Sequence, residues 1–280
     1  MDEATEHVRA LARRVVAAAL ELGPLRAALL AGSGARGDAD RYSDVDLLLY
    51  VDEPVEEGRL ERLCEALGGE RLLRLGPELV QFEVGGVAVQ VVYYTLARLD
   101  DELDTALVRH EEVIDSPNQK LLSGLLEGLV LHGEDVVAPR RERAEAYPEP
   151  LRRAAIEQHW QFFPLWYYGP AMAGRDAELW RLDMLLDASF NLLGVLAALN
   201  RVWYARFQLK RVRAFEAKLR LAPPRLADRL ESLFALPPDE AADELARLVV
   251  ETKALVEAEL PDLELPLRRG PGERLQPWSL

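Results

Sequence analysis

The sequence predicts an α+β fold, in which a domain with a mixed β-sheet is followed by an all-helical bundle domain. In the first part of the chain, apolar runs of strand length alternate with amphipathic segments of helical period. Beyond Pro150, every long segment has the helical period, and prolines or glycines separate the segments. The polar, charged and proline-containing stretch 133–150 indicates the boundary between the domains. We therefore expect domains at residues 1–140 and 145–280.

The first domain is expected to open with a helix and two strands. Residues 5–22 place apolar side chains on one side of a helix, which ends at Gly23 and Pro24. Residues 25–31 form a short apolar run. Residues 43–51 begin polar and then become continuously apolar, as a buried strand does.

A hairpin is expected next, because residues 80–84 and 87–94 flank Gly85-Gly86, a pair typical of a two-residue turn. The other elements expected in this domain are helices over 56–67, 97–107 and 117–127, an unassigned stretch at 111–115 and a strand over 129–132. In the second domain we expect helices over 151–167, 176–203, 206–221, 224–235 and 239–258, followed by irregular chain.

The composition disfavours several classes of protein. The 280 residues carry a formal net charge of −14, whereas proteins that bind long nucleic acids through their phosphates are usually basic. No uninterrupted apolar run reaches the roughly 18 residues of a membrane span, and the acidic start lacks the order of a secretory signal. The single cysteine, Cys64, suits a reducing compartment. We expect a cytoplasmic protein without membrane or long nucleic acid partners; a homodimer is left open.

One segment has a spacing typical of phosphate and metal chemistry. The first expected strand leads into Gly32–Arg36, where glycine lets backbone N–H groups approach a phosphate and Ser33 and Arg36 can donate to it. Asp44 and Asp46 follow on the next strand and share a face, about 7 Å apart at Cα. Mg²⁺ prefers such carboxylates together with phosphate oxygens. The alternative is a capped turn before two solvated acids, but the whole pattern favours function.

The pattern over residues 25–94 resembles the signature of the DNA polymerase β-like nucleotidyltransferase superfamily. The order of the two domains is similar to that of the aminoglycoside and lincosamide antibiotic nucleotidyltransferases. The resemblance implies that Asp44 and Asp46 are catalytic ligands of Mg²⁺ and that a nucleoside triphosphate, ATP being favoured, is the co-substrate. The residues implied to hold that triphosphate are Gly32, Ser33 and Arg36.

The chain departs from the superfamily at the third carboxylate, which normally lies in mid-strand after the hairpin. The matching residue is Gln90, whose amide can coordinate a metal through its carbonyl but carries no charge. The expected hairpin pairs Gln90 with Gln81. Glu83 then pairs with Ala88 and lies diagonally to Gln90, about 7–8 Å away. Glu83 could supply the missing charge; the alternative is an ordinary polar strand residue.

The second domain offers candidates for a general base and for a phosphate contact. Asp183, Asp187 and Glu157 are acids within helical segments rich in apolar or aromatic residues, a setting that suits a general base, and Asp183 is preferred. Lys210, in the basic segment 206–220, is expected from the resemblance to contact the triphosphate. For each residue the alternative is a solvated position on a helix.

Two functions from different classes follow. The first is an enzyme in which an acceptor hydroxyl attacks the α-phosphate and pyrophosphate leaves. Its preferred acceptor is a small polar molecule such as an aminoglycoside-like antibiotic, with a protein side chain or an RNA end as alternatives. The second is a degenerate module that binds nucleotide or protein without turnover, and its main support is Gln90.

Overall fold

The computed structural model describes residues 3–56, 58–76, 78–110, 117–172, 175–206, 210–276 and 278–279. Contacts divide the chain into two compact units. The sheet unit comprises Met1–Arg109 and Leu121–Ala146, and the helical unit comprises His110–Lys120 and Tyr147–Leu280. The division expected from the sequence differs in placing residues 110–120 with the sheet.

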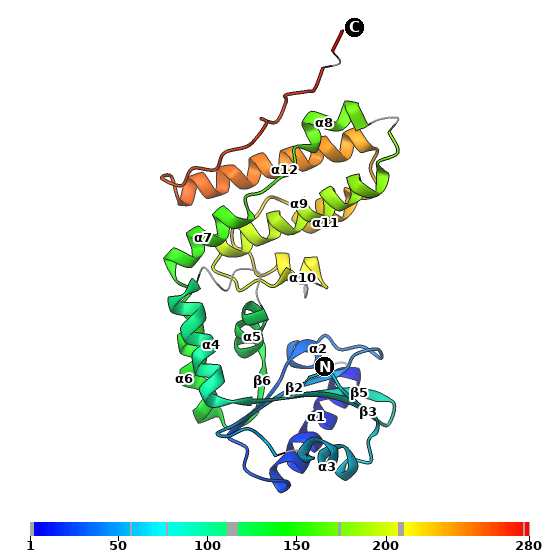
Figure 1. Cartoon of the computed structure of the whole chain (residues 1–280), viewed down its shortest axis with the longest axis vertical. Coiled ribbons are helices and arrows are strands. Elements are labelled where there is room, and N and C mark those ends of the chain that lie inside the picture. The colour runs from blue at the N-terminus through cyan, green and yellow to red at the C-terminus, as the bar shows by residue number, and fades with distance from the viewer. Residues whose placement is uncertain are drawn as a thin grey trace. The chain divides into compact units, whose positions relative to one another are not determined.

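In the described part of the sheet unit, six strands form one mixed sheet of order β3-β4-β5-β2-β1-β6 (Figure 1). The strands are β1 (Ala27–Leu30), β2 (Val45–Val51), β3 (Glu70–Arg74), β4 (Leu79–Val84), β5 (Val87–Thr95) and β6 (Leu129–His132). Strands β2 and β5 pair in parallel, and the other neighbours are antiparallel. A parallel pair needs a long crossover, which here contains a helix and the strands β3 and β4.

One face of the sheet packs against α1 (Glu3–Glu21) and α3 (Arg59–Ala66), as Figure 1 shows. Alternate strand residues point to this face and are fully buried, among them Val45 and Leu47 of β2 and Val89 and Val91 of β5. Each such side chain stabilises the fold by about 1.5–3 kcal/mol. Because side chains alternate along a strand, the residues between them lie on the opposite face. Asp46 and Gln90 are therefore directed away from the α1 side.

The other helices with residues in the sheet unit are α2 (Gly32–Arg36), α4 (Leu96–Val108), α5 (Pro117–Glu127) and α6 (Glu134–Glu145). Helix α6 occupies most of the stretch 133–150, in which the boundary between the domains was expected. The division between the two units falls within that stretch, between Ala146 and Tyr147. Arg140 of α6 donates to both carboxylate oxygens of Asp100 on α4, at 2.9 and 2.6 Å. Buried side chains on one side of α6 add packing. These tertiary contacts offset the lost hydrogen bond of Pro139, which sequence reasoning treats as a break.

The helical unit surrounds a hydrophobic core of its own. Its helices are α7 (Glu149–His159), α8 (Leu165–Met172), α9 (Glu178–Leu199), α10 (Val212–Glu216), α11 (Leu226–Ser232) and α12 (Pro238–Glu259). The C-terminal half of α9 lies at the centre, where every residue from Leu192 to Leu199 is buried. Helices α7 and α12 pack against it. Trp166, 1% exposed, fills the core beside them.

By length and composition alone, α9 could cross a membrane, but 61% of its most apolar stretch is buried inside the helical unit. Its apolar character is therefore explained by the core that it forms.

The chain after α12 is irregular, as expected, yet it is fixed to the helices. Trp160 Nε1 donates to the Pro266 carbonyl at 3.1 Å, and Trp166 Nε1 donates to the Arg269 carbonyl at 3.2 Å. Leu265 is buried in the core of the unit. Indole N–H groups usually find a partner when buried, and here the backbone of the C-terminal segment accepts them.

The expected α+β class, a mixed sheet followed by helices, is confirmed. Three details differ. Strand β3 was not expected, because all its side chains are exposed and no alternation marks it. The helix expected over 151–167 is interrupted at 160–164, before α8, and the described part of 206–221 is helical only in α10. The stretch 111–115 lies outside the described residues.

Candidate functional site

The glycine-rich segment forms α2 directly after β1. Gly32 has a φ of +64°, in the left-handed region that glycine adopts at little cost. A Cβ atom at Gly32 would lie 2.5 Å from Oδ2 of Asp46, so the carboxylate can approach this turn closely only because residue 32 is glycine. The Ala31 amide donates to the Asp46 carbonyl at 2.8 Å. The turn and the second aspartate of the predicted motif are therefore in contact.

Helix α1 holds the other side of α2. Arg9 donates from Nε to the Gly34 carbonyl at 2.8 Å and from Nη2 to the Ala35 carbonyl at 2.9 Å. A Cβ atom at Gly34 would lie 2.6 Å from Cγ1 of Val8, so this glycine permits close packing of α1. Sequence reasoning missed Arg9, because nothing local distinguishes it from the other arginines of α1.

Ser33 and Arg36, the expected phosphate contacts, both lie on α2. The Ser33 carbonyl accepts from the amides of Gly37 at 2.9 Å and Asp38 at 3.1 Å, which closes the loop. Arg36 Nε lies 3.5 Å from Oδ1 of Asp38 in an ion pair whose two side chains are 37% and 32% exposed. Such a pair is worth about 0–1 kcal/mol, so a phosphate can compete for the guanidinium.

Asp46, Gln90 and Gln81 form a polar row across three neighbouring strands. The parallel register of β2 and β5 pairs Asp46 with Gln90, and the hairpin pairs Gln90 with Gln81, as expected. Gln90 Nε2 donates to Gln81 Oε1 at 3.2 Å. All three side chains are half-buried. The row thus begins at the carboxylate that contacts Gly32 and continues with two uncharged amides.

Glu83 pairs with Ala88, which confirms the expected hairpin register. Its carboxylate accepts from Arg71 Nη1 at 2.9 Å. Glu83 also lies on β4, two strands from Asp46, and strand spacing puts two strands roughly 10 Å apart. A single cation with metal–oxygen distances near ~2 Å cannot be shared over that distance. The structure therefore does not bring Glu83 and Asp46 together.

The carboxylates present suit one magnesium ion rather than two. Asp44 is half-buried and directly precedes β2, in which Asp46 is the second residue. In the part of the chain that the structure describes, no three His, Cys, Asp or Glu side chains gather where they could hold a metal. Mg²⁺ is commonly bound by one or two carboxylates plus substrate phosphates, and Asp44 and Asp46 fit that requirement. A second ion would lack the charge that Gln90 does not supply.

Two tyrosines further along the same face of the sheet are poor candidates for a base. Tyr50 of β2 pairs with Tyr94 of β5. Burial raises the pKa of the Tyr50 hydroxyl, and burial likewise raises the pKa of the Tyr94 hydroxyl. Both hydroxyls stay protonated near neutral pH.

The preferred general-base candidate, Asp183, lies in the helical unit. It is exposed on α9, so the apolar setting expected from its sequence neighbours is not present. Neighbours in sequence on a helix point about 100° apart, so an apolar run can leave an acid in solvent. Asp187 accepts from Arg206 at 2.7 Å and from Asn191 Nδ2 at 3.1 Å, and Glu157 is exposed.

Lys210 also lies in the helical unit. It is exposed and precedes α10, which contains five residues, so the long basic helix expected over 206–220 is absent from the described residues. Lys210 lines a groove of that unit. Its expected contact with a triphosphate stays a prediction.

Comparison with known proteins agrees with this arrangement. Residues 12–123 match the family described as a nucleotidyltransferase domain, a stretch that includes the Gly32 turn, both aspartates and Gln90. Among solved structures, a nucleotidyltransferase-like protein from Exiguobacterium sibiricum 255-15 is similar at 10% identity and a TM-score of 0.38, over 89% of this chain and 74% of that one. No curated protein is significantly similar to the chain.

Proposed function

We propose that the chain moves a nucleoside monophosphate from a nucleoside triphosphate to a hydroxyl group of a small acceptor, because residues 12–123 match the nucleotidyltransferase domain family. The observation that carries the proposal is the contact between Asp46 and the Gly32 turn. It places a candidate metal ligand beside a candidate phosphate loop. The family match supports the reaction class independently of that geometry.

In the proposed reaction, the acceptor oxygen forms a bond to the α-phosphorus while the bond from that phosphorus to the bridging oxygen breaks and pyrophosphate leaves. Ser33 and Arg36 would bind the phosphates, and the α2 loop, held by Arg9, would orient them. Asp44 and Asp46 would hold Mg²⁺, which supplies charge stabilisation at the phosphates. Positioning supplies much of the remaining acceleration.

For the co-substrate and acceptor we propose ATP and a small polar molecule of the aminoglycoside-like class. A net charge of −14 favours a cationic acceptor over a polyanion. The same acidity and the single cysteine support a cytoplasmic protein that does not bind long nucleic acid. A protein side chain is the alternative acceptor, which would make the chain a protein adenylyltransferase.

A second candidate function is nucleotide binding without turnover. It is favoured by Gln90, which leaves the polar row with one charged member, and by the ion pair that engages Glu83. A domain of this kind would hold a triphosphate through the α2 loop and would act through a partner protein. Both candidate functions predict that the chain binds a nucleoside triphosphate, but only the enzyme transfers the nucleoside monophosphate to an acceptor.

The test is transfer of label from α-labelled nucleoside triphosphates, with Mg²⁺ and a panel of acceptors, monitored by chromatography. Asp46→Asn should reduce transfer at least about 100-fold, because a charge that acts at the reacting phosphates is lost. Asp52→Asn is the matched control. Asp52 follows β2 at its other end and pairs with Arg26 at 2.8 Å, so this variant should keep full activity.

Labelled product that depends on Asp46 and not on Asp52 would establish the enzyme. Nucleotide binding by calorimetry without transfer to any acceptor would favour the binding module. Equal loss in both aspartate variants would contradict the proposed role of Asp46.

A further inference from the structure

Tyr42 is the most exposed tyrosine of the chain, and it lies within the segment that forms the candidate site. It is 98% exposed, whereas the other seven tyrosines of the sequence are buried or half-buried. It follows the α2 loop and precedes Asp44 by two residues. Tyrosine side chains are usually at least partly buried, so full exposure at this place in the fold is unusual.

A tight turn over residues 40–43 holds Tyr42 in this position. The Asp40 amide donates to Ser43 Oγ at 2.9 Å, and the Ser43 amide donates to the Asp40 carbonyl at 3.1 Å. The Tyr42 amide donates to Oδ1 of Asp40 at 2.9 Å. Asp and Ser side chains commonly order turns by such bonds to the backbone. An ordered turn therefore presents the Tyr42 side chain to solvent.

The Tyr42 hydroxyl is accessible to a reaction partner. Among the described residues, no hydrogen bond or ion pair involves this hydroxyl, whereas the neighbouring Ser43 hydroxyl donates to Oδ1 of Asp40 at 3.2 Å. A hydroxyl oxygen is the kind of acceptor that the proposed function requires, and tyrosine can act as a nucleophile in group transfer. Tyr42 is thus a candidate acceptor on the protein itself.

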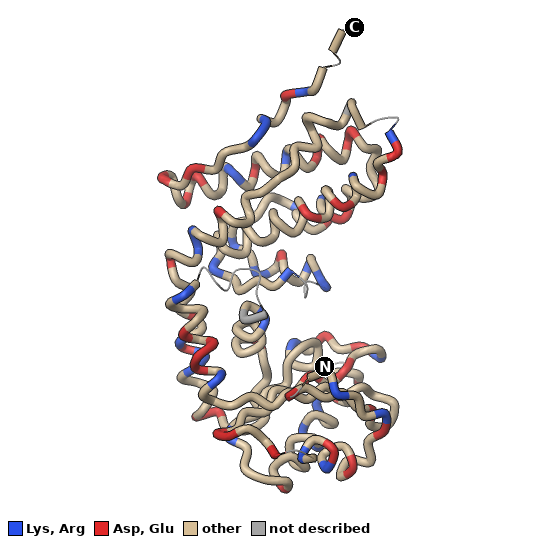
Figure 2. The backbone as a smooth tube through the Cα atoms, viewed as in Figure 1, with Lys and Arg blue, Asp and Glu red and all other residues tan. Residues whose placement is uncertain are grey.

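The exposure of Tyr42 favours transfer between two copies of the chain over transfer within one. At 98% exposed, the side chain makes almost no contact with the Gly32 turn or Asp44 of its own chain. Because Tyr42 lies so near Asp44 in sequence, a twofold approach of two copies at this loop brings each Tyr42 towards the site of the other. The loop carries Arg36 and Arg41 together with acids (Figure 2), so opposite charges can meet in such an encounter.

We propose that Tyr42 is a nucleotidylation site that a second copy of this chain modifies. The Tyr42 oxygen forms a bond to the α-phosphorus of ATP held by the other copy. The bond from that phosphorus to the bridging oxygen breaks, pyrophosphate leaves with the bonding electrons, and the hydroxyl proton passes to water. The product is a phosphodiester that joins Tyr42 to adenosine. The inference rests on the proposed function and deepens it, because it names a protein hydroxyl as one acceptor.

The first test incubates the full chain with Mg²⁺ and α-labelled ATP, without any other acceptor, and locates the label by peptide mass spectrometry. We expect the label on the peptide that contains Tyr42, and Tyr42→Phe, which removes only the hydroxyl, should lose it. Tyr167→Phe is the matched control, because Tyr167 is half-buried in the helical unit, and this variant should be labelled like the wild type. Label only on other residues, or equal labelling of Tyr42→Phe, overturns the proposal.

A mixing experiment tests transfer between copies. Tyr42→Phe, which keeps the metal carboxylates, is mixed with a tagged Asp46→Asn chain, which keeps Tyr42. Neither variant should be labelled alone, and in the mixture the label should appear only on the tagged chain. A mixture without label, under conditions in which the wild type labels itself, would show transfer within one chain and would overturn the proposal.

The acceptor panel used for the proposed function separates the failure of that function from the failure of this inference. Transfer to a panel acceptor with no label on Tyr42 overturns the inference alone. Label on Tyr42 with no transfer to any panel acceptor supports the inference and contradicts the small acceptor. No transfer to Tyr42 or to any acceptor overturns both. Circular dichroism checks that each variant is folded.

Discussion

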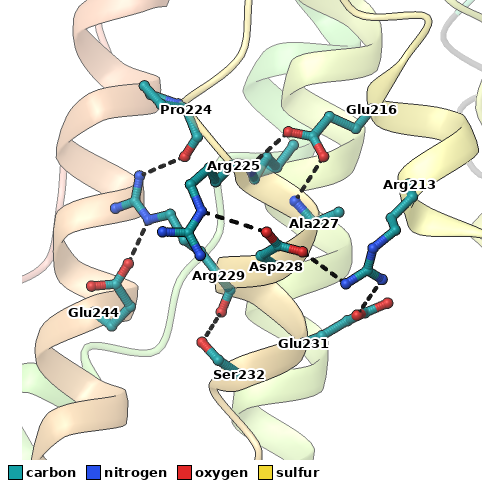
Figure 3. Close-up of polar contacts among 11 residues, drawn as sticks. Arg213, Glu216, Pro224, Arg225, Ala227, Asp228, Arg229, Glu231, Ser232 and Glu244 are labelled. Carbon is teal, nitrogen blue, oxygen red and sulfur yellow. Dashed lines mark hydrogen bonds and ion pairs between the residues drawn. The ribbon is translucent and has the colours of Figure 1, made fainter.

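The two units are shaped by different constraints. In the sheet unit, backbone register places Asp46 beside Gln90, and a glycine at residue 32 leaves room for the carboxylate. In the helical unit, ion pairs join helices that pack around a hydrophobic core, such as those of Arg229 with Glu244, drawn in Figure 3, and with Glu251. We infer that substitutions at the first kind of position change chemistry, whereas those at the second kind change stability.

The largest effect is expected from Gly32→Ala. The added methyl group meets Oδ2 of Asp46 and the residue must keep a φ of +64°, so Asp46 should be displaced and transfer should fall about 100-fold. Gly68→Ala is the matched control, since Gly68 has the same φ with nothing within 4 Å of the added atom. Both variants should lose about 1 kcal/mol of stability from backbone strain. If transfer falls equally in both, strain rather than the contact with Asp46 is responsible.

Arg229→Met tests the helical unit. It leaves Glu244 and Glu251 without their shared cation, and Glu244 is only 14% exposed. The free energy of unfolding of the helical unit should fall by about 3 kcal/mol, measured by denaturant titration. Arg225→Met is the control, because that arginine is 78% exposed and its contact with Asp228 is 3.5 Å long. It should cost less than about 1 kcal/mol.

The contribution of Arg229 to the stability of the helical unit should also depend on pH. Burial raises the pKa of Glu244, but hydrogen bonds and charge from Arg229 and Arg247 outweigh it, so the pKa lies below its ordinary value. A depressed pKa contributes stability above the unfolded-state pKa, near ~4.3, and that stability is lost as pH falls through the folded value. The gap in stability between wild type and Arg229→Met should therefore narrow below about pH 4. A gap that stays constant down to pH 3 would contradict this account.

A smaller effect is expected from Arg9→Met. The variant releases the Gly34 and Ala35 carbonyls and loosens the α2 loop, so affinity for a nucleoside triphosphate should weaken about fivefold, measured by calorimetry. Arg13→Met changes an exposed arginine one turn further along α1 and should leave affinity unchanged. Weakened binding in neither variant would show that α2 does not depend on α1 for its conformation.

The smallest change is expected from Gln90→Glu, which restores a charge to the polar row. In the presence of a non-hydrolysable nucleotide, Mn²⁺ binding measured by electron paramagnetic resonance should become severalfold tighter. Gln81→Glu adds the same charge one strand further from Asp46 and should have a weaker effect. If Gln81→Glu tightens Mn²⁺ binding more than Gln90→Glu does, the metal lies nearer to β4 than to Asp46.

Local patterns predicted the sheet unit well because its candidate functional features are local in sequence. The turn at Gly32, the spacing of the aspartates and the two-glycine hairpin each follow from a few consecutive residues, and the register of Gln90 with Gln81 followed from them. The contact of Arg9 with α2 could not be predicted, since it joins residues 25 and 26 positions apart. The contact between Arg71 and Glu83 could not be predicted either, because the sequence of β3 shows no alternation of apolar and polar residues and the strand was not expected.

The helical unit was less predictable where side-chain orientation decides the outcome. Its helical class followed from periodicity, but the exposure of Asp183 depends on the face that α9 presents to its neighbours. The shortness of α10 was also not apparent from composition, because a basic segment suits a helix and a loop equally. Helix α6 within the expected boundary region 133–150 was not predicted, because the contact of Arg140 with Asp100, which helps to hold it, spans 40 positions.

The apolar character of α9 has a consequence for handling the protein. Helix α9 is covered by α7, which precedes it in the chain, and by α12, which follows after α10 and α11. In a fragment that stops before α12, the apolar surface of α9 would be exposed to solvent. Such a fragment is expected to aggregate, to bind chaperones or to insert into membranes. Fragments for expression should therefore keep α7 through α12 together.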